Sequence, residues 1–221
     1  MIVQSMTPEE VYREIDQDMP DVSAWWMRER KRLEQIAKWT IKLPRTTWYD
    51  HESPRRNRYL VMSIILGRKY NDASVTAVLA LQRMERGWAV YFTCWPWQMA
   101  ASRIVLLPHV FDQYANPERG NVRKTGIALI EHFVERNCHG EQTTDSRFSG
   151  RSVRYRDRVN LCASVNDGVL LGEDLDGIFV AHTFITYEMA NGLQRAEFEK
   201  NREKVLSSRE AYEKIREIYG Y

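Results

Sequence analysis

One histidine and several clustered cations have the types and spacing that suit chemistry on a phosphate group. His109 follows Pro108 at the end of an apolar run, and a partly exposed histidine can serve as a general base or a general acid. Arg119, Arg123 and Lys124 come shortly after it, and such cations can stabilise negative charge on a phosphate during a reaction. We therefore take His109 as a candidate catalytic residue and the three cations as candidate anion-binding residues.

The segment that follows has the apolar pattern of an amphipathic helix from about Asn121 to about Asn137. Acidic side chains are the stabilising choice at the start of a helix, yet this start is cationic. Cations there make sense if an anion binds the free backbone amides of the first turn. The alternative is that these side chains simply extend into solvent.

A second group of cations lies on a predicted strand. Side chains alternate between Ser152 and Leu161 so that Arg154, Arg156 and Arg158 share one face. This row can bind phosphates, or it can pair with acidic side chains of a neighbouring strand and hold the sheet in register. We favour the structural role and keep the three arginines as candidate anion-binding residues.

The elements that position these residues begin with helices. Thr7 and Glu10 form a capping-box signature ahead of a short helix that ends near Asp18, and a second helix runs from about Asp21 to about Lys42. Extended runs follow at 59–66, 75–84, 88–94, 103–107 and 178–186. Their short connections indicate hairpins, whereas residues 139–150 predict a loop and residues 166–168 a tight turn.

These elements predict an α+β fold: an antiparallel β-meander sheet with a central amphipathic helix, flanked by N-terminal and C-terminal helices. We expect a single domain over residues 1–221, because a chain of this length can share one core. Its parts are an N-terminal helical segment (1–44), an α+β core (45–187) and C-terminal helices (188–221). The strand at 178–186 is expected at or near the centre of the sheet.

Composition narrows the classes of function. The 221 residues carry a formal net charge of +2, so any case for nucleic acid rests on local clusters of cations. The three cysteines, Cys94, Cys138 and Cys162, suit reduced thiols better than disulfides, and we find neither a signal peptide nor a membrane span. We expect a cytoplasmic protein that needs no cofactor and no metal, because His132, Cys138 and His139 lack a zinc pattern.

The order of the candidate residues resembles that of small metal-independent ribonucleases of bacterial toxin systems. Those enzymes place a histidine before or on a helix, arginines on the sheet and a threonine in a late strand. The matching residues here are His109, the arginine row and Thr183, over about a third of the chain, with Gln113 where an arginine is common in such patterns. The resemblance implies a second catalytic residue, Thr183, and cleavage of RNA without a metal.

We therefore expect an anion-binding face that binds, or cleaves, nucleic acid or another phosphate-bearing ligand. The alternative is a non-enzymatic assembly module, in which Trp25, Trp26 and Trp39 bind a partner or a second copy through the terminal helices. A third possibility is a small-ligand groove at residues 95–97, where two tryptophans flank a proline.

Overall fold

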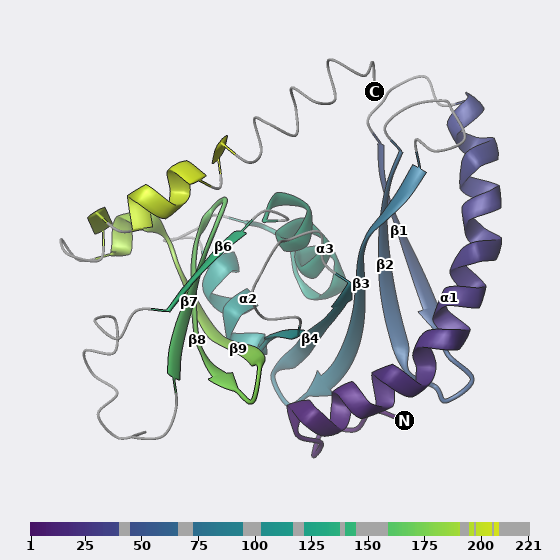
Figure 1. Ribbon diagram of the computed structural model, residues 1–221, viewed down its shortest axis with the longest axis horizontal. Helices are drawn as coiled ribbons and strands as arrows, with labels where there is room; N and C mark the ends of the chain where they lie inside the picture. The colour runs from purple at the N-terminus through teal and green to yellow at the C-terminus, as the bar shows by residue number, and fades with distance from the viewer. Residues whose placement is uncertain are drawn as a thin grey trace. The chain divides into compact units, whose positions relative to one another are not determined.

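The computed structural model describes residues 1–39, 45–65, 73–94, 103–116, 122–137, 140–144, 159–190, 195–196, 198–204 and 206–207. The fold is α+β with mostly antiparallel strands and helices toward both ends, as the sequence predicts (Figure 1). The chain forms two compact units. The first includes Met1–Arg83 and Tyr91–Trp95, and the second includes Met84–Val90 and Pro96–Ala211. A single domain over 1–221 stays a prediction.

The first unit begins with one long helix, α1 (Pro8–Trp39). The predicted capping box is present at its start. The Thr7 backbone N–H donates a hydrogen bond to Glu10 Oε2 at 2.8 Å, and the Glu10 N–H donates to Thr7 Oγ1 at 3.4 Å. These bonds satisfy two amides that the first helical turn leaves without an intrahelical acceptor.

The predicted break between two helices near Asp18 to Asp21 is wrong, because α1 continues through Pro20. A proline inside a helix removes one backbone hydrogen bond and commonly costs about 3 kcal/mol. Burial on both sides of Pro20 offsets that cost: Val11 and Ile15 are buried before it, and Leu33 after it. The prediction failed because it divided one continuous apolar face between two helices.

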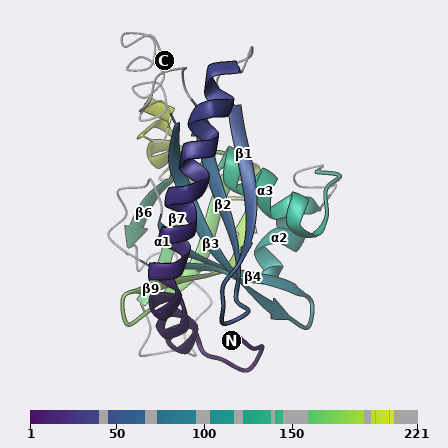
Figure 2. The same cartoon turned by 90° about the vertical axis from the view of Figure 1, so that its right-hand side faces the viewer.

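Strands β1 (Arg45–Glu52), β2 (Arg58–Ile65) and β3 (Ala73–Met84) pair in chain order in this part of the fold. Strand β4 (Gly87–Cys94) comes next along the chain and has residues in both units. Helix α1 covers one face of β1 and β2 (Figure 2). Its side chains Leu33 and Ala37 pack against Ile65, and Trp26 and Tyr49 border the same cluster. The connection between β1 and β2 is also tied to α1, through the buried carboxylate of Asp18, which accepts a hydrogen bond from Ser53 Oγ at 2.8 Å.

Five strands pair in the second unit in the order β5-β9-β8-β7-β6. They are β5 (Arg103–Leu106), β6 (Gly140–Thr144), β7 (Val159–Val165), β8 (Gly168–Leu175) and β9 (Ile178–Ile185). Strand β9 lies between β5 and β8, which confirms its predicted central place. It pairs parallel with β5 and antiparallel with β8, so the meander has one parallel pair.

Two helices pack on this set of strands: α2 (Pro108–Ala115) and the predicted central helix, α3 (Gly126–Arg136). Their shared core is aromatic. The Phe133 ring is fully buried, and its centroid lies 5.6 Å from that of Phe111, 4.9 Å from that of Tyr114 and 6.0 Å from that of Phe184, each in an edge-to-face arrangement. Aromatic pairs prefer this edge-to-face arrangement, and these contacts hold both helices against β9.

Two local predictions in this unit are wrong. Helix α3 begins at Gly126 and not near Asn121, since Gly126 turns the chain with a φ of 58° that favours glycine. Strand β6 (Gly140–Thr144) occupies part of the predicted loop at 139–150. Its antiparallel partner β7 supplies the ladder hydrogen bonds, and a polar composition does not reveal that such a partner exists.

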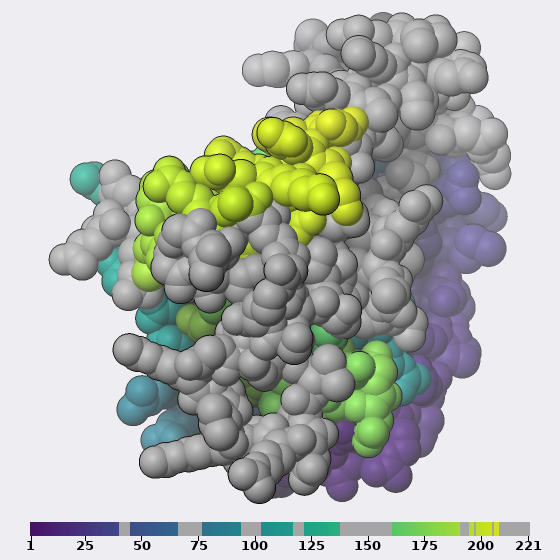
Figure 3. All heavy atoms as spheres, turned by 60° about the vertical axis from the view of Figure 1, so that its left-hand side comes forward, coloured from purple at the N-terminus to yellow at the C-terminus, as the bar shows by residue number. Residues whose placement is uncertain are grey.

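The C-terminal part of the chain is helical where it is described, at 195–196, 198–204 and 206–207, and Figure 3 shows it in yellow on the surface. Phe198 is its buried anchor, packed in a cluster with Cys162, Val169 and Tyr187. Within the described ranges, no helix is both long and apolar enough to cross a lipid bilayer.

Candidate functional site

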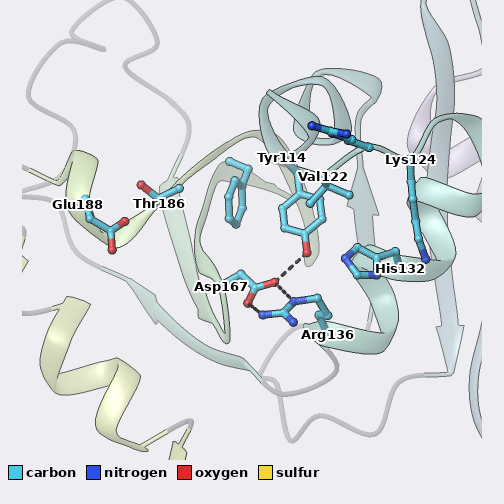
Figure 4. Close-up of a pocket in the computed structure, with 10 residues that line it drawn as sticks. Tyr114, Val122, Lys124, His132, Arg136, Asp167, Thr186 and Glu188 are labelled. Carbon is cyan, nitrogen blue, oxygen red and sulfur yellow. Dashed lines mark hydrogen bonds and ion pairs between the residues drawn. The ribbon is translucent and has the colours of Figure 1, made fainter. Parts of the chain in front are cut away.

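A pocket of about 660 Å³ opens in the second unit (Figure 4). This volume falls within the range of about 300 to 1,000 Å³ that is usual for small-molecule sites. Helix α2, the segment before α3, α3 itself, the β7–β8 turn and the chain at the end of β9 all contribute to it. The lining residues are Tyr114, Val122, Arg123, Lys124, His132, Arg136, Asp167, Phe184, Thr186 and Glu188.

Helix α3 places two of the lining residues by its period. His132 and Arg136 are four residues apart, so they lie one turn apart on the same face. The adjacent face of the helix is buried through Leu129, Ile130 and Phe133. Because this apolar face must meet the core, the polar face is turned toward the pocket.

The carboxylate of Asp167 organises one wall. Arg136 donates two hydrogen bonds to it, from Nε to Oδ2 at 2.7 Å and from Nη2 to Oδ1 at 2.7 Å. The Tyr114 hydroxyl donates a third, to Oδ2 at 2.8 Å. Such a two-pronged contact between a guanidinium and a carboxylate is the strong form of this ion pair, and it links α2, α3 and the β7–β8 turn.

The side chain of Asn137 completes this link from the end of α3. Its Oδ1 accepts the backbone N–H of Asp167 at 2.9 Å, while its Nδ2 donates to the Phe133 carbonyl oxygen at 3.0 Å. Asn137 is fully buried and is the C-cap residue of α3. The turn therefore receives hydrogen bonds to both its backbone and its side chain, so its position relative to α3 is strongly determined.

Gly168 explains why the turn can lie so close to β9. A Cβ atom at this position would collide with the Ile185 carbonyl oxygen and the Phe184 ring. Only glycine lets β8 begin at this distance from β9. Asp167, the residue before it, is thereby brought to the pocket wall beside Phe184.

The network changes the acid–base behaviour of its members. Burial by itself disfavours the charged carboxylate of Asp167, but the hydrogen bonds from Arg136 and Tyr114 outweigh it, so the pKa of Asp167 is lowered. Burial, together with the bond to Asp167, raises the pKa of Tyr114. Around neutral pH the wall therefore holds an ionised carboxylate, a charged guanidinium and a neutral phenol. Its two formal charges cancel.

His132 lines the pocket beside this wall, with its ring centroid 6.2 Å from that of Tyr114. Burial lowers the pKa of His132 first, and the charges of Lys124 and Arg136 lower it further. The imidazole is therefore neutral at neutral pH, with one nitrogen able to accept a proton. A general base needs that state, and His132 is the histidine that the structure brings to the pocket.

Arg123 and Lys124 supply the pocket with cations from the segment just before α3. Both side chains are exposed, and neither forms an ion pair with any other residue that the structure describes. The adjoining helix start has Thr125 as its N-cap with no side-chain cap hydrogen bond, and no acidic residue in its first turn. The amides of that turn keep their partial positive charge, so this end of the pocket attracts anions.

The structure brings together only some of the residues predicted from the sequence. Arg123 and Lys124 line the pocket. His109 is the second residue of α2 and is exposed, whereas Thr183 is half-buried on β9. Neither lines the pocket, because Tyr114 faces it from α2 and Phe184 faces it from β9, where neighbouring side chains point to opposite faces. Their catalytic roles stay predictions.

The remaining predicted residues lie outside the described part of the chain. These are Arg119, the arginine row of Arg154, Arg156 and Arg158, and the tryptophans at 95 and 97. Their roles also stay predictions. Among the residues that the structure does describe, no group of three or more His, Cys, Asp or Glu side chains is arranged to hold a metal ion.

Sequence reasoning missed the residues that build the wall. Asp167 was recognised only as part of a tight turn, and Tyr114 and Arg136 had no predicted role in a site. The sequence Asn166-Asp167-Gly168 did contain a usable signal for a site. It places an acidic side chain in the turn between two paired strands, and functional residues are often found in such loops. Nothing local indicates that Arg136, thirty-one residues earlier, is its partner.

No protein-family model, no curated protein and no solved structure matches this chain. The resemblance to toxin ribonucleases therefore stays a prediction from the sequence, and what the pocket does is argued from its own residues.

Proposed function

We propose that the pocket of the second unit binds the phosphate group of a nucleotide, either free or within a single strand of nucleic acid. The observation that supports this most is the pair of cations, Arg123 and Lys124, that line the pocket beside an uncapped helix start. Phosphate oxygens accept hydrogen bonds both from such side chains and from the free amides of a first helical turn.

The charge balance of the lining supports an anion over a neutral ligand. Arg136 and Asp167 neutralise each other through their paired hydrogen bonds. Arg123 and Lys124 form no such pair with described residues, so they supply the net charge at their end of the pocket. Their positive charge also lowers the cost of bringing a dianion into a partly enclosed site.

The pocket size and the neutral imidazole of His132 fit the same ligand. A volume of about 660 Å³ accommodates a single nucleotide but no duplex. A neutral His132 can take a proton from a hydroxyl group near the bound phosphate. The proposal thus extends to cleavage of a single strand in this pocket, with His132 as the candidate base. His109 and Thr183 lie outside the pocket and stay catalytic candidates from the sequence alone.

Replacing both cations, as Arg123→Gln with Lys124→Gln, should weaken binding of AMP about tenfold at low salt, since two charge-assisted contacts are lost. Isothermal titration calorimetry at two salt concentrations measures this. The wild-type affinity should fall with salt more steeply than that of the variant, because salt screens the two charge–charge contacts that the variant lacks.

Arg28→Gln with Lys31→Gln is the matched control, because it removes the same charge from exposed positions on α1. AMP affinity equal in both double variants would contradict the proposal. Gel analysis of labelled single-stranded RNA in the same samples tests for cleavage, and cleavage that survives both His109→Ala and His132→Ala would remove both histidines from the chemistry.

A second candidate function, self-association through the N-terminal helix, is favoured by one observation. Trp39 exposes 85% of its surface at the end of α1. By contrast, Trp25 stacks on the His51 ring at 4.4 Å between centroids, and Trp26 packs on Tyr49. Only Trp39 of the three predicted interaction residues is thus available to a partner.

If α1 mediates assembly, sedimentation of the wild-type protein should give a mass that rises with concentration, and Trp39→Ser should reduce that rise. Met27→Ser is the control, since Met27 is a second exposed apolar residue of α1 that does not share the Trp39 face. A constant mass equal to that of one chain would exclude this function.

A further inference from the structure

The charges around the pocket are divided between two sides. Figure 4 shows Lys124 and His132 on one side and Thr186 and Glu188 on the other, with Tyr114 between them. The cations come from the segment before α3, whereas Thr186 and Glu188 come from the chain just after β9. A ligand that fills the pocket therefore meets a positive side and a negative side.

Glu188 keeps its charge available to a ligand. A hydrogen bond to its own backbone N–H, and then one with the Thr186 side chain, lower its pKa. The charges of Arg202 and Arg195 lower this pKa further, although the closest contacts of these arginines are with other residues: Arg195 donates to Glu199 at 3.0 Å, and Arg202 lies over the Tyr187 ring at 4.7 Å. Glu188 forms no ion pair with a residue that the structure describes.

The chemistry of a carboxylate defines what it can recognise. An ionised carboxylate only accepts hydrogen bonds, so it favours groups with N–H or O–H donors. It also repels a phosphate, which leaves the phosphate to the side of Arg123 and Lys124. The positive and negative sides thus determine the orientation of the bound ligand. The wall between them is electrically neutral because Asp167 and Arg136 form an ion pair.

We propose that the pocket selects a nucleotide whose base carries an exocyclic amino group, with the amino group donating to Glu188 and the phosphate bound by Arg123 and Lys124. This inference rests on the proposed function, since it assumes that the phosphate occupies the cationic side. A carboxylate can accept a hydrogen bond from the amino group of a base, as Glu and Asp do from the N4 amino group of cytosine. A nucleotide with the amino group would then bind more tightly than an otherwise identical nucleotide without it, because it forms one more hydrogen bond.

The test compares AMP with the purine ribonucleotide that lacks only the 6-amino group. Wild-type protein should bind AMP about fivefold to tenfold more tightly, the ratio expected for one charge-assisted hydrogen bond at a solvent-accessible site. Glu188→Ala should bind the two ligands equally. Glu188→Gln should keep part of the preference, because its amide oxygen still accepts a hydrogen bond.

Asp112→Asn is the control variant. It removes one negative charge from an exposed position of α2 that does not line the pocket, so it should leave the ratio unchanged. Equal wild-type affinities for the two nucleotides, or a preference that survives Glu188→Ala, would overturn this inference while the dependence on Arg123 and Lys124 stood. Absence of binding by either nucleotide would overturn the proposed function together with it.

Discussion

Asp167→Ala is expected to lower the free energy of unfolding by about 3 kcal/mol. The substitution leaves the guanidinium of Arg136 without its carboxylate and the partly buried Tyr114 hydroxyl without its acceptor. Removing one partner of such a buried pair commonly costs about 3 to 5 kcal/mol, and we take the lower end because half of the Arg136 side chain is exposed. Urea unfolding followed by circular dichroism measures the change.

Asp167→Ala should also lose the preference of the pocket for AMP over the nucleotide without the 6-amino group. The reason is that Asp167 links α2, α3 and the β7–β8 turn, which together form the pocket. Asp112→Ala is the control, since it removes an exposed carboxylate of α2 that has no place in this network. A loss of stability below about 1 kcal/mol for Asp167→Ala would mean that the network contributes little beyond a surface ion pair.

The contribution of Asp167 should depend on pH in a defined direction. Its pKa in the folded protein is lowered from the ordinary value of 3.8. The carboxylate therefore stabilises the fold fully above that ordinary value, and the stabilisation is lost as the pH falls below it toward the folded-state pKa. The difference in stability between wild type and Asp167→Asn should shrink over the same acidic range.

The second large effect is expected at Asp18, where Asp18→Ala should cost about 3 kcal/mol. Its carboxylate is 2% exposed. One oxygen, Oδ2, accepts hydrogen bonds from Ser53 Oγ, from Asn57 Nδ2 at 2.7 Å and from the Tyr59 hydroxyl at 2.9 Å. Alanine leaves three buried donors without an acceptor, and each unsatisfied group costs about 1 kcal/mol or more.

Burial, together with the bond to Asp18, raises the pKa of Tyr59, so its hydroxyl is protonated and can donate at neutral pH. Tyr59→Phe removes only one of the three bonds and should cost about 1 kcal/mol. Urea unfolding of Asp18→Ala and Tyr59→Phe separates the free energy of the Tyr59–Asp18 hydrogen bond from that of all three hydrogen bonds to Asp18. Equal losses in both would show that the bond from the Tyr59 hydroxyl on β2 accounts for the whole contribution of Asp18.

Local signals explain which parts of the fold were predictable. The capping box at Thr7 and Glu10 involves groups three residues apart, and the turn at Asn166-Asp167 joins two adjacent strands. The apolar run that begins β9 likewise reflects burial on both faces of one strand. Each of these patterns depends on neighbours along the chain, so the α+β class and most strands could be predicted before any contact was known.

The wrong predictions share a different cause. Helix α1 passes through Pro20 because it packs on the sheet, and β6 forms because β7 offers it a partner. In both cases the favourable free energy comes from contacts with distant segments, which offset an unfavourable local preference. A pattern of neighbouring residues cannot predict contacts with segments that are distant in the sequence.

The sequence by itself determined the class of the fold, the start of α1 and the cations Arg123 and Lys124 as anion-binding candidates. Only the tertiary structure decided that these cations face a pocket whose wall joins Tyr114 and Arg136 to Asp167. These partners lie fifty-three and thirty-one residues from Asp167 along the chain. Their meeting depends on how α2 and α3 pack on β9, and that packing is a property of the whole unit because the aromatic core beneath the pocket is shared by all three elements.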